Sequence, residues 1–199
     1  PDGWPVRRRN GRCDLKIYTV ALCCGTAFAL CSSPAVAADS EPASTGPVIE
    51  QFGPVYDIGR PDFPTPTNLV YRAVFDVGPS PEAADQVNPR IESLARFLNM
   101  HARAGVKPEQ MKLALVVHGA AGKDMLSSAA YKSRFGVENP NAPLLAALRS
   151  QGVRVLLCGQ TAVHKGFARE ELAPGVELAL SAMTALVALQ ADGYELISF

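Results

Sequence analysis

Two patterns of hydrophobic and polar positions alternate along the chain from residue 69 onward. Short apolar runs, typical of buried strands, lie at Leu69–Val77, Met111–Val117, Val153–Leu157 and Tyr194–Phe199. Apolar residues at helical spacing lie from Pro89 to about Ala104, over Pro143–Ser150 and over Val176–Ala191. Strands that alternate with helices predict an α/β fold, a mainly parallel sheet with helices on both faces.

Capping residues support the predicted helices, and weaker sequence signals predict two further short helical segments. Asn88 and Pro89 form an N-cap followed by a first helical residue, and Gly105 ends that helix. A weak helix through Tyr131 and Arg134 and a short helical piece at Arg169–Leu172 are also expected. The Val176–Ala191 helix is apolar on almost every side, which predicts burial against the sheet and against a partner subunit.

Residues 1–37 have the pattern of a secretory signal peptide. Basic residues precede the apolar stretch Ile17–Leu30, and Ala35-Val36-Ala37 is a small-x-small cleavage site. We therefore expect a periplasmic protein that has no membrane segment after cleavage, the main alternative being an uncleaved anchor.

A proline-rich arm, residues 38–68, separates this segment from the predicted domain at residues 69–199. Its prolines favour extended backbone, with a short strand or hairpin expected around Val48–Ile58. Apolar residues within it indicate that the arm packs on the domain or on a neighbouring subunit.

The charge balance and the cysteine content limit the classes of function that this chain can have. The chain has 19 Lys and Arg and 19 Asp and Glu residues, so no basic field points to nucleic acid. Four of its cysteines, Cys13, Cys23, Cys24 and Cys31, lie in the segment predicted to be removed, which leaves Cys158. An exported chain with one unpaired cysteine has no disulfide framework, and its thiol is either reactive or a small buried hydrophobe.

Cys158 lies where the strand Val153–Leu157 ends and Gly159 opens a turn. The following residues are expected to form a helix that carries His164 and Lys165. Ligands of open α/β sheets bind at the carboxyl ends of the strands, and a helix amino terminus there favours the reactive thiolate. His164 and Lys165 are candidates to bind a small anionic adduct on the sulfur, or else a capping group and a solvated cation.

His118 and Gly119 end another strand at the same predicted edge, so His118 is expected near the thiol or serves only as a turn residue. The loop is not a phosphate-binding loop, because Ala120 and Ala121 alone separate its glycines. The scattered histidines have no metal-ligand spacing, and no Gly-x-Ser-x-Gly elbow occurs, so neither a metal site nor a serine hydrolase is expected.

The segment Cys158-Gly-Gln-Thr-Ala-Val-His-Lys-Gly166 resembles the cysteine loop of the DsrE/DsrF-like sulfur-relay family. The strand before His118-Gly119 and the final helix and strand are similar as well, so the resemblance covers about residues 69–199. The sequence departs at His164, where the family usually has a second basic residue, and in its exported amino terminus.

The resemblance implies a three-layer fold of about five mainly parallel strands that assembles as a homotrimer or homohexamer. It implies that Cys158 accepts sulfane sulfur as a persulfide and passes it between donor and acceptor proteins, with no cofactor. Lys165 and His164 would hold the anionic persulfide, and Gly159 would let backbone amides approach it closely. Gln160 and the His118-Gly119 turn are the other candidate binding residues.

Two other classes of protein stay open at this stage. The chain could be a non-catalytic oligomeric binding module of the same fold, in which Cys158 only packs. It could also be an exported thiol-redox or sulfur-oxidation accessory enzyme that needs the second thiol of a partner.

Overall fold

The computed structural model describes residues 41–198, so the predicted signal peptide lies outside the described residues. Its one five-stranded sheet consists of β1 Tyr71–Val77, β2 Met111–Val117, β3 Arg154–Cys158, β4 Glu177–Ala179 and β5 Glu195–Ser198. The strands lie in the order β4-β3-β2-β1-β5, and every neighbouring pair is parallel. The predicted α/β class with about five parallel strands is confirmed.

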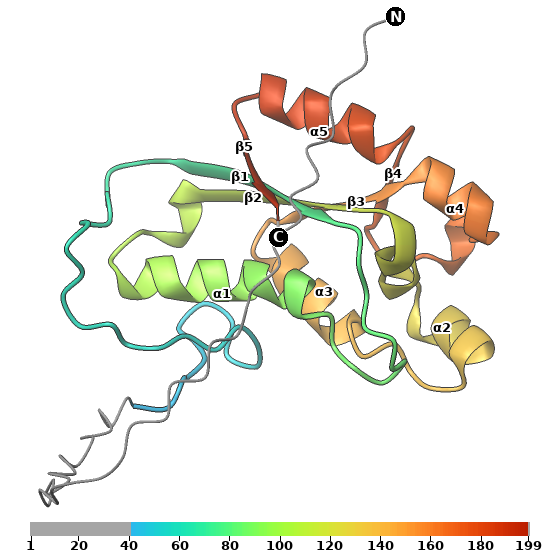
Figure 1. Ribbon diagram of the computed structural model, residues 1–199, viewed down its shortest axis with the longest axis horizontal. Coiled ribbons are helices and arrows are strands. Elements are labelled where there is room, and N and C mark those ends of the chain that lie inside the picture. The colour runs from blue at the N-terminus through green and yellow to red at the C-terminus, as the bar shows by residue number, and fades with distance from the viewer. Residues whose placement is uncertain (1–40, 199) are drawn as a thin grey trace, which may run out of the picture. The chain divides into compact units, whose positions relative to one another are not determined.

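Helices cover the sheet on both faces. The α-helices are α1 Pro89–Arg103, α2 Ser128–Phe135, α3 Ala142–Ser150, α4 Gly159–Lys165 and α5 Ala182–Ala191. Three short 3₁₀ segments are η1 Pro108–Gln110, η2 Gly119–Met125 and η3 Arg169–Glu171. Figure 1 shows α1 and α3 on one side of the sheet and α5 on the other, which gives three layers.

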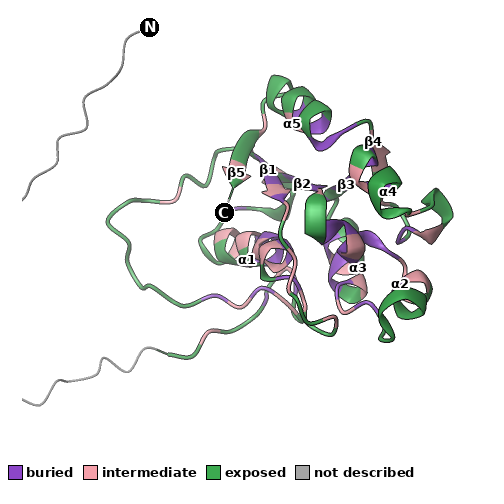
Figure 2. Cartoon of the chain, turned by 45° about the vertical axis from the view of Figure 1, so that its right-hand side comes forward, coloured by how far each residue is buried: buried purple, intermediate pink, exposed green. Residues whose placement is uncertain are grey.

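Successive strand residues point to opposite faces, which divides the core in two. Phe75, Leu115 and Leu157 pack in the layer of α1 and α3. Val116 and Cys158 pack in the smaller cluster under α5. Figure 2 shows buried residues along the central strands, whereas α5 is mostly exposed. Burial on both faces explains why these strands are nearly continuous apolar runs in the sequence.

The predicted helix Val176–Ala191 is wrong in its first part. Glu177–Ala179 forms strand β4, and the helix begins only at Ala182. Ser181 separates the two elements, because its side chain accepts a hydrogen bond from the Thr184 amide and caps α5. In the described chain the sheet covers only one side of α5, since Met183 is 75% and Val187 68% exposed, and the predicted cover by a partner subunit stays a prediction.

The arm packs on the domain, which confirms one of the two predicted alternatives. Its expected strand or hairpin is reduced to an isolated bridge between Ser44 and Val55. Asn99 of α1, which is fully buried, holds the arm through hydrogen bonds with the backbone of Val48, Ile49, Phe52 and Gly53. Ile49 is buried in the core beside it.

A buried polar cluster fixes the loops beside the carboxyl edge of the sheet. Asp124 accepts hydrogen bonds from Asn88 (2.8 Å) and Ser80 (3.0 Å). Asn139 donates to the carbonyls of Asp124 and Leu126. Burial raises the pKa of Asp124, although these donors and Lys123 oppose the rise. The network ties η2, which follows His118, to the start of α1.

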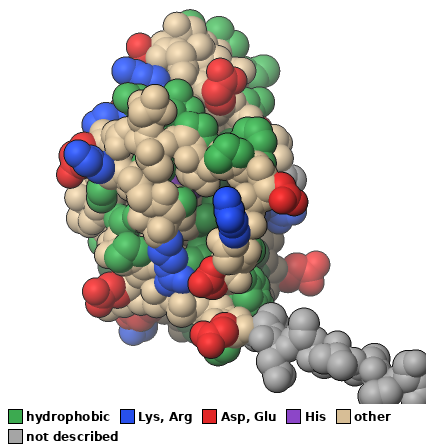
Figure 3. Space-filling model, turned by 90° about the vertical axis from the view of Figure 1, so that its left-hand side faces the viewer, with side chains coloured by type: hydrophobic (Ala, Val, Ile, Leu, Met, Phe, Trp, Pro, Cys, Tyr) green, Lys and Arg blue, Asp and Glu red, His purple; other side chains and the backbone are tan. Residues whose placement is uncertain are grey.

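The outer surface is mixed in charge on the side seen in Figure 3, where acidic and basic side chains are interspersed with apolar ones. Within residues 41–198, no helix combines the length and the hydropathy that crossing a bilayer requires.

Candidate functional site

Three adjacent strands bring Gly78, His118 and Cys158 into one row at the carboxyl edge of the sheet. Val117 pairs with Val77 on one side and with Leu157 on the other, so the next residue of each strand lies in line. His118 is extended (φ −148°, ψ −177°), and the alternation of faces therefore continues through it. The positions of His118 and Cys158 face the α5 layer on strands that are about 4.8 Å apart.

Cys158 is 6% exposed, yet polar groups face its sulfur. Burial by itself raises the pKa of the thiol. The backbone N–H groups of Thr161, Ala182 and Gln160 and the Thr161 hydroxyl oppose burial and hold the pKa of Cys158 below its ordinary value. The Cys158 side chain makes no capping hydrogen bond at the start of α4. The N–H groups therefore act on the sulfur through their dipoles. The surroundings therefore favour the thiolate.

The amides around the sulfur come from two helices. Thr161 and Gln160 lie in the first turn of α4, and Ala182 is the first residue of α5. Gly159 allows this convergence, because a Cβ there would lie 2.5 Å from the Ala179 carbonyl oxygen of β4. The close approach of β4 brings the start of α5 over Cys158.

Thr161 joins the two strand-end loops. Its hydroxyl oxygen accepts a hydrogen bond from the Gly119 amide (3.1 Å), and the same hydroxyl faces the sulfur of Cys158. The His118-Gly119 turn and the Cys158 loop, predicted to share one edge, thus form one hydrogen-bonded unit. Gln160 adds a link to the β4–α5 connection by donating to the Leu180 carbonyl (3.3 Å).

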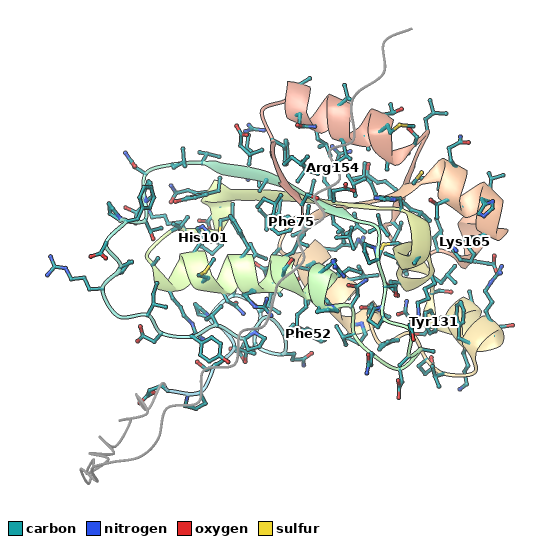
Figure 4. The ribbon with its side chains drawn as sticks, viewed as in Figure 1. Phe52, Phe75, His101, Tyr131, Arg154 and Lys165 are labelled. Atoms are coloured by element: carbon teal, nitrogen blue, oxygen red, sulfur yellow. The ribbon has the colours of Figure 1, made fainter. Side chains whose placement is uncertain are left out.

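His164 and Lys165 lie at the other end of α4 from the sulfur. Both are exposed residues of its last turn, and a rise of 1.5 Å per residue puts them roughly 9–10 Å along the helix from Cys158. Figure 4 shows Lys165 at this far end. Lys165 instead lines a hollow of about 670 Å³ together with Lys123 and Arg134.

His118 is paired with a carboxylate that the sequence reasoning missed. Its Nε2 lies 3.1 Å from Oδ1 of Asp76, on β1. The available signal was a lone acidic residue in the apolar run of that strand. The roles of Thr161 and Ala182 beside the sulfur were missed as well, because a backbone N–H donor is present in almost every residue and gives no sequence signal. Among residues 41–198, no three His, Cys, Asp or Glu side chains cluster as metal ligands.

Replacing Thr161 by valine tests the electrostatics of the sulfur. The Thr161→Val protein loses the hydroxyl donor, so the pKa of Cys158 is expected to rise and alkylation at pH 7 to slow by about 3–10-fold. The rate of iodoacetamide alkylation, followed by intact mass between pH 6 and 10, measures both effects. Thr67→Val, an exposed change of the same kind, is the control. Identical pH profiles for Thr161→Val and wild type would contradict this account.

Comparison with known proteins gives one family. The sequence model of the DsrE/DsrF-like family matches residues 70–199, which include the whole sheet and the Cys158 loop. None of the curated proteins matches the chain.

Two similar solved structures are MTH1491, a protein of unknown function from Methanobacterium thermoautotrophicum, and the ychN protein from E. coli. The first has 19% identity and a TM-score of 0.49, over 65% of this chain and 99% of its own. The second has 17% identity and a TM-score of 0.47, over 64% of this chain and 99% of its own.

Proposed function

This chain belongs to the DsrE/DsrF-like family through residues 70–199, and from that premise we propose that it is a sulfur carrier that holds sulfane sulfur as a persulfide on Cys158. Membership suggests a role of the sulfur-relay type. The observation that carries the finer proposal is the surroundings of Cys158, where N–H groups of two helices face the sulfur and lower the pKa of its thiol. Such surroundings suit an anionic sulfur better than a packing residue.

The proposed reaction moves one sulfur atom without net oxidation. The Cys158 thiolate attacks the outer sulfur of a donor persulfide, and the S–S bond of the donor breaks. The inner donor sulfur leaves with the bonding electron pair and takes up a proton to become a thiol. Cys158 then carries the sulfane sulfur until an acceptor thiolate attacks that outer atom in the same way.

The test is the gain of one sulfur atom by the purified protein. Incubation with a small organic persulfide is expected to add about 32 Da per chain, and the Cys158→Ser protein is expected to gain nothing. Brief treatment with a reductant should reverse the gain, because a persulfide is reducible. No gain by the wild type, or an equal gain by Cys158→Ser, would overturn the proposal.

A non-catalytic binding module is the second candidate function, and the slight exposure of Cys158 is the observation that favours it. A thiol that only packs reacts slowly and keeps an ordinary or raised pKa. The alkylation profile described for Thr161 therefore separates the two functions, since a carrier thiol titrates below its ordinary range.

We propose in addition that the protein associates with itself. Ala182, Ala185 and Leu189 bury one side of α5, whereas Met183 and Val187 remain exposed on it. Large apolar side chains gathered on one surface are typical of subunit contacts, and Leu180, just before the start of α5, is exposed as well. A second copy is the proposed occupant, in a homotrimer or homohexamer as the sequence resemblance implies.

The proposed compartment follows from the sequence of residues 1–37. We propose that the carrier is exported, loses this segment and exchanges sulfur with donor and acceptor proteins of the periplasm. The basic and apolar pattern of the segment supports this proposal.

A further inference from the structure

An acid–base pair lies on the same face of the sheet as Cys158, with His118 one strand away from it and Asp76 two strands away. Asp76 of β1 has the same side-chain parity as Val74, which packs under α5 with Cys158. Asp76 lies in register with Val116, two residues before His118 on β2. The His118 Nε2 and Asp76 Oδ1 atoms are 3.1 Å apart, so the carboxylate reaches the imidazole along the strand ends.

Gly78 makes room for this geometry. It lies opposite His118 at the end of β1, and a Cβ at that position would come within 2.8 Å of the His118 ring. The ring therefore lies over the end of β1, where it meets Asp76. Among residues 41–198, the other ring nitrogen, Nδ1, has no hydrogen-bond partner.

Solvent reaches part of both side chains of the pair, whereas the carboxylate oxygen that faces the imidazole is buried. The His118 side chain is 40% exposed and that of Asp76 24%. Oδ1 of Asp76 is buried and has no other partner among the described residues, and its alignment with the imidazole falls short of a full hydrogen bond. Catalytic hydrogen bonds are often long or poorly aligned before a substrate arrives. The imidazole is thus partly open to solvent while a carboxylate faces its Nε2.

We propose that His118 is the general acid–base group of sulfur transfer at Cys158 and that Asp76 is its positioning residue. This inference rests on the proposed function. A donor persulfide whose outer sulfur meets Cys158 would have its leaving sulfur on the exposed side of the same sheet edge, within the row that His118 occupies. His164 and Lys165 are less suited to this task, because they lie at the far end of α4.

The proton balance of the step is closed. His118 takes up the proton that the Cys158 thiol releases as the thiolate forms, and the resulting imidazolium faces Asp76. The thiolate then displaces the inner sulfur of the donor, and His118 returns the proton to that leaving group. One S–S bond breaks and one forms, so no electrons are gained or lost overall. When an acceptor removes the sulfur, the same proton moves in the reverse order.

A leaving-group series tests the role of His118. The purified protein is mixed with two organic persulfides, one with an aliphatic thiol as leaving group and one with a far more acidic aryl thiol. We expect His118→Gln to slow sulfur gain from the aliphatic donor on the order of 10²-fold, the low end for general acid catalysis. We expect less than about threefold slowing with the aryl donor, because an acidic thiol leaves without protonation. Asp76→Asn should show the same selectivity to a smaller degree.

Controls keep this inference separate from the proposed function. His101→Gln removes an imidazole from α1, in the opposite layer, and should leave both rates unchanged. If the wild type gains no sulfur from either donor, the carrier proposal itself fails. If the wild type gains sulfur and His118→Gln slows both donors equally or neither, the acid–base role fails while the carrier stands. Should Asp76→Asn not fold, the His118→Gln series still decides the outcome.

Discussion

Replacing Asn99 by alanine is expected to release the arm from α1 and to lower the free energy of unfolding by about 3 kcal/mol. The Asn99 side chain is fully buried and makes five hydrogen bonds to the backbone of the arm. Each group left buried without a partner costs about 1–3 kcal/mol, but a released arm regains water, which limits the loss. Burial of Ile49 and Val55 is lost as well.

Thermal unfolding measures the loss of stability, and limited proteolysis measures the release of the arm. The midpoint of thermal unfolding should fall by roughly 6–12 °C, and cleavage should move into the arm. Asn68→Ala, the same change at an exposed position, is the control. An Asn99→Ala protein whose arm resists the protease as in the wild type would show that the arm is held mainly by its apolar residues.

The second large effect is expected at Gly159, where alanine should slow persulfide formation about tenfold or more and destabilise the fold by about 2 kcal/mol. The added Cβ would lie 2.5 Å from the Ala179 carbonyl oxygen and 3.3 Å from that of Leu180, both of which are backbone atoms. The chain from β4 to α5 must shift to accept it. That shift would move the Ala182 amide away from the sulfur of Cys158 and weaken the preference for thiolate.

Gly136→Ala is the matched control for this change. Gly136 has a φ of +81°, and a Cβ there would meet no atom within 4 Å. Its replacement costs about 1–2 kcal/mol through backbone strain alone and should leave persulfide formation unaffected. Equal rates of sulfur gain in Gly159→Ala and wild type would show that α5 does not need its present position for the chemistry.

The strands with long apolar runs could be predicted from the sequence, and the short edge strand β4 could not. β1, β2 and β3 are buried on both faces, and such burial leaves a continuous hydrophobic run. β4 has only three residues, Glu177–Ala179, and is half-exposed at the edge of the sheet. Glu, Leu and Ala are also strong helix formers, so the sequence pattern predicts one continuous helix over the residues of β4 and α5. Tertiary pairing with β3 decides between the two states.

The parts of the candidate site that lie at strand ends could be predicted from the sequence. The contacts that depend on how neighbouring strands pair could not. Cys158 and His118 each follow a buried strand, so their common edge follows from the parallel sheet. The partnership of His118 with Asp76 depends on which residues of β1 and β2 lie in register, and no local pattern contains that information. The distance of Lys165 from Cys158 follows from helix length, since one residue adds only 1.5 Å.

The capped start of α5 has a kinetic consequence. Because Ala182 packs on Cys158 and the sulfur is buried, we expect a bulky reagent to reach it only during brief local openings of that helix end. The ratio of labelling rates for a large and a small alkylating agent would then report the free energy of opening. A protein that delivers sulfur would also need the start of α5 to open. Its affinity for the opened helix end would then set how fast the sulfur is exchanged.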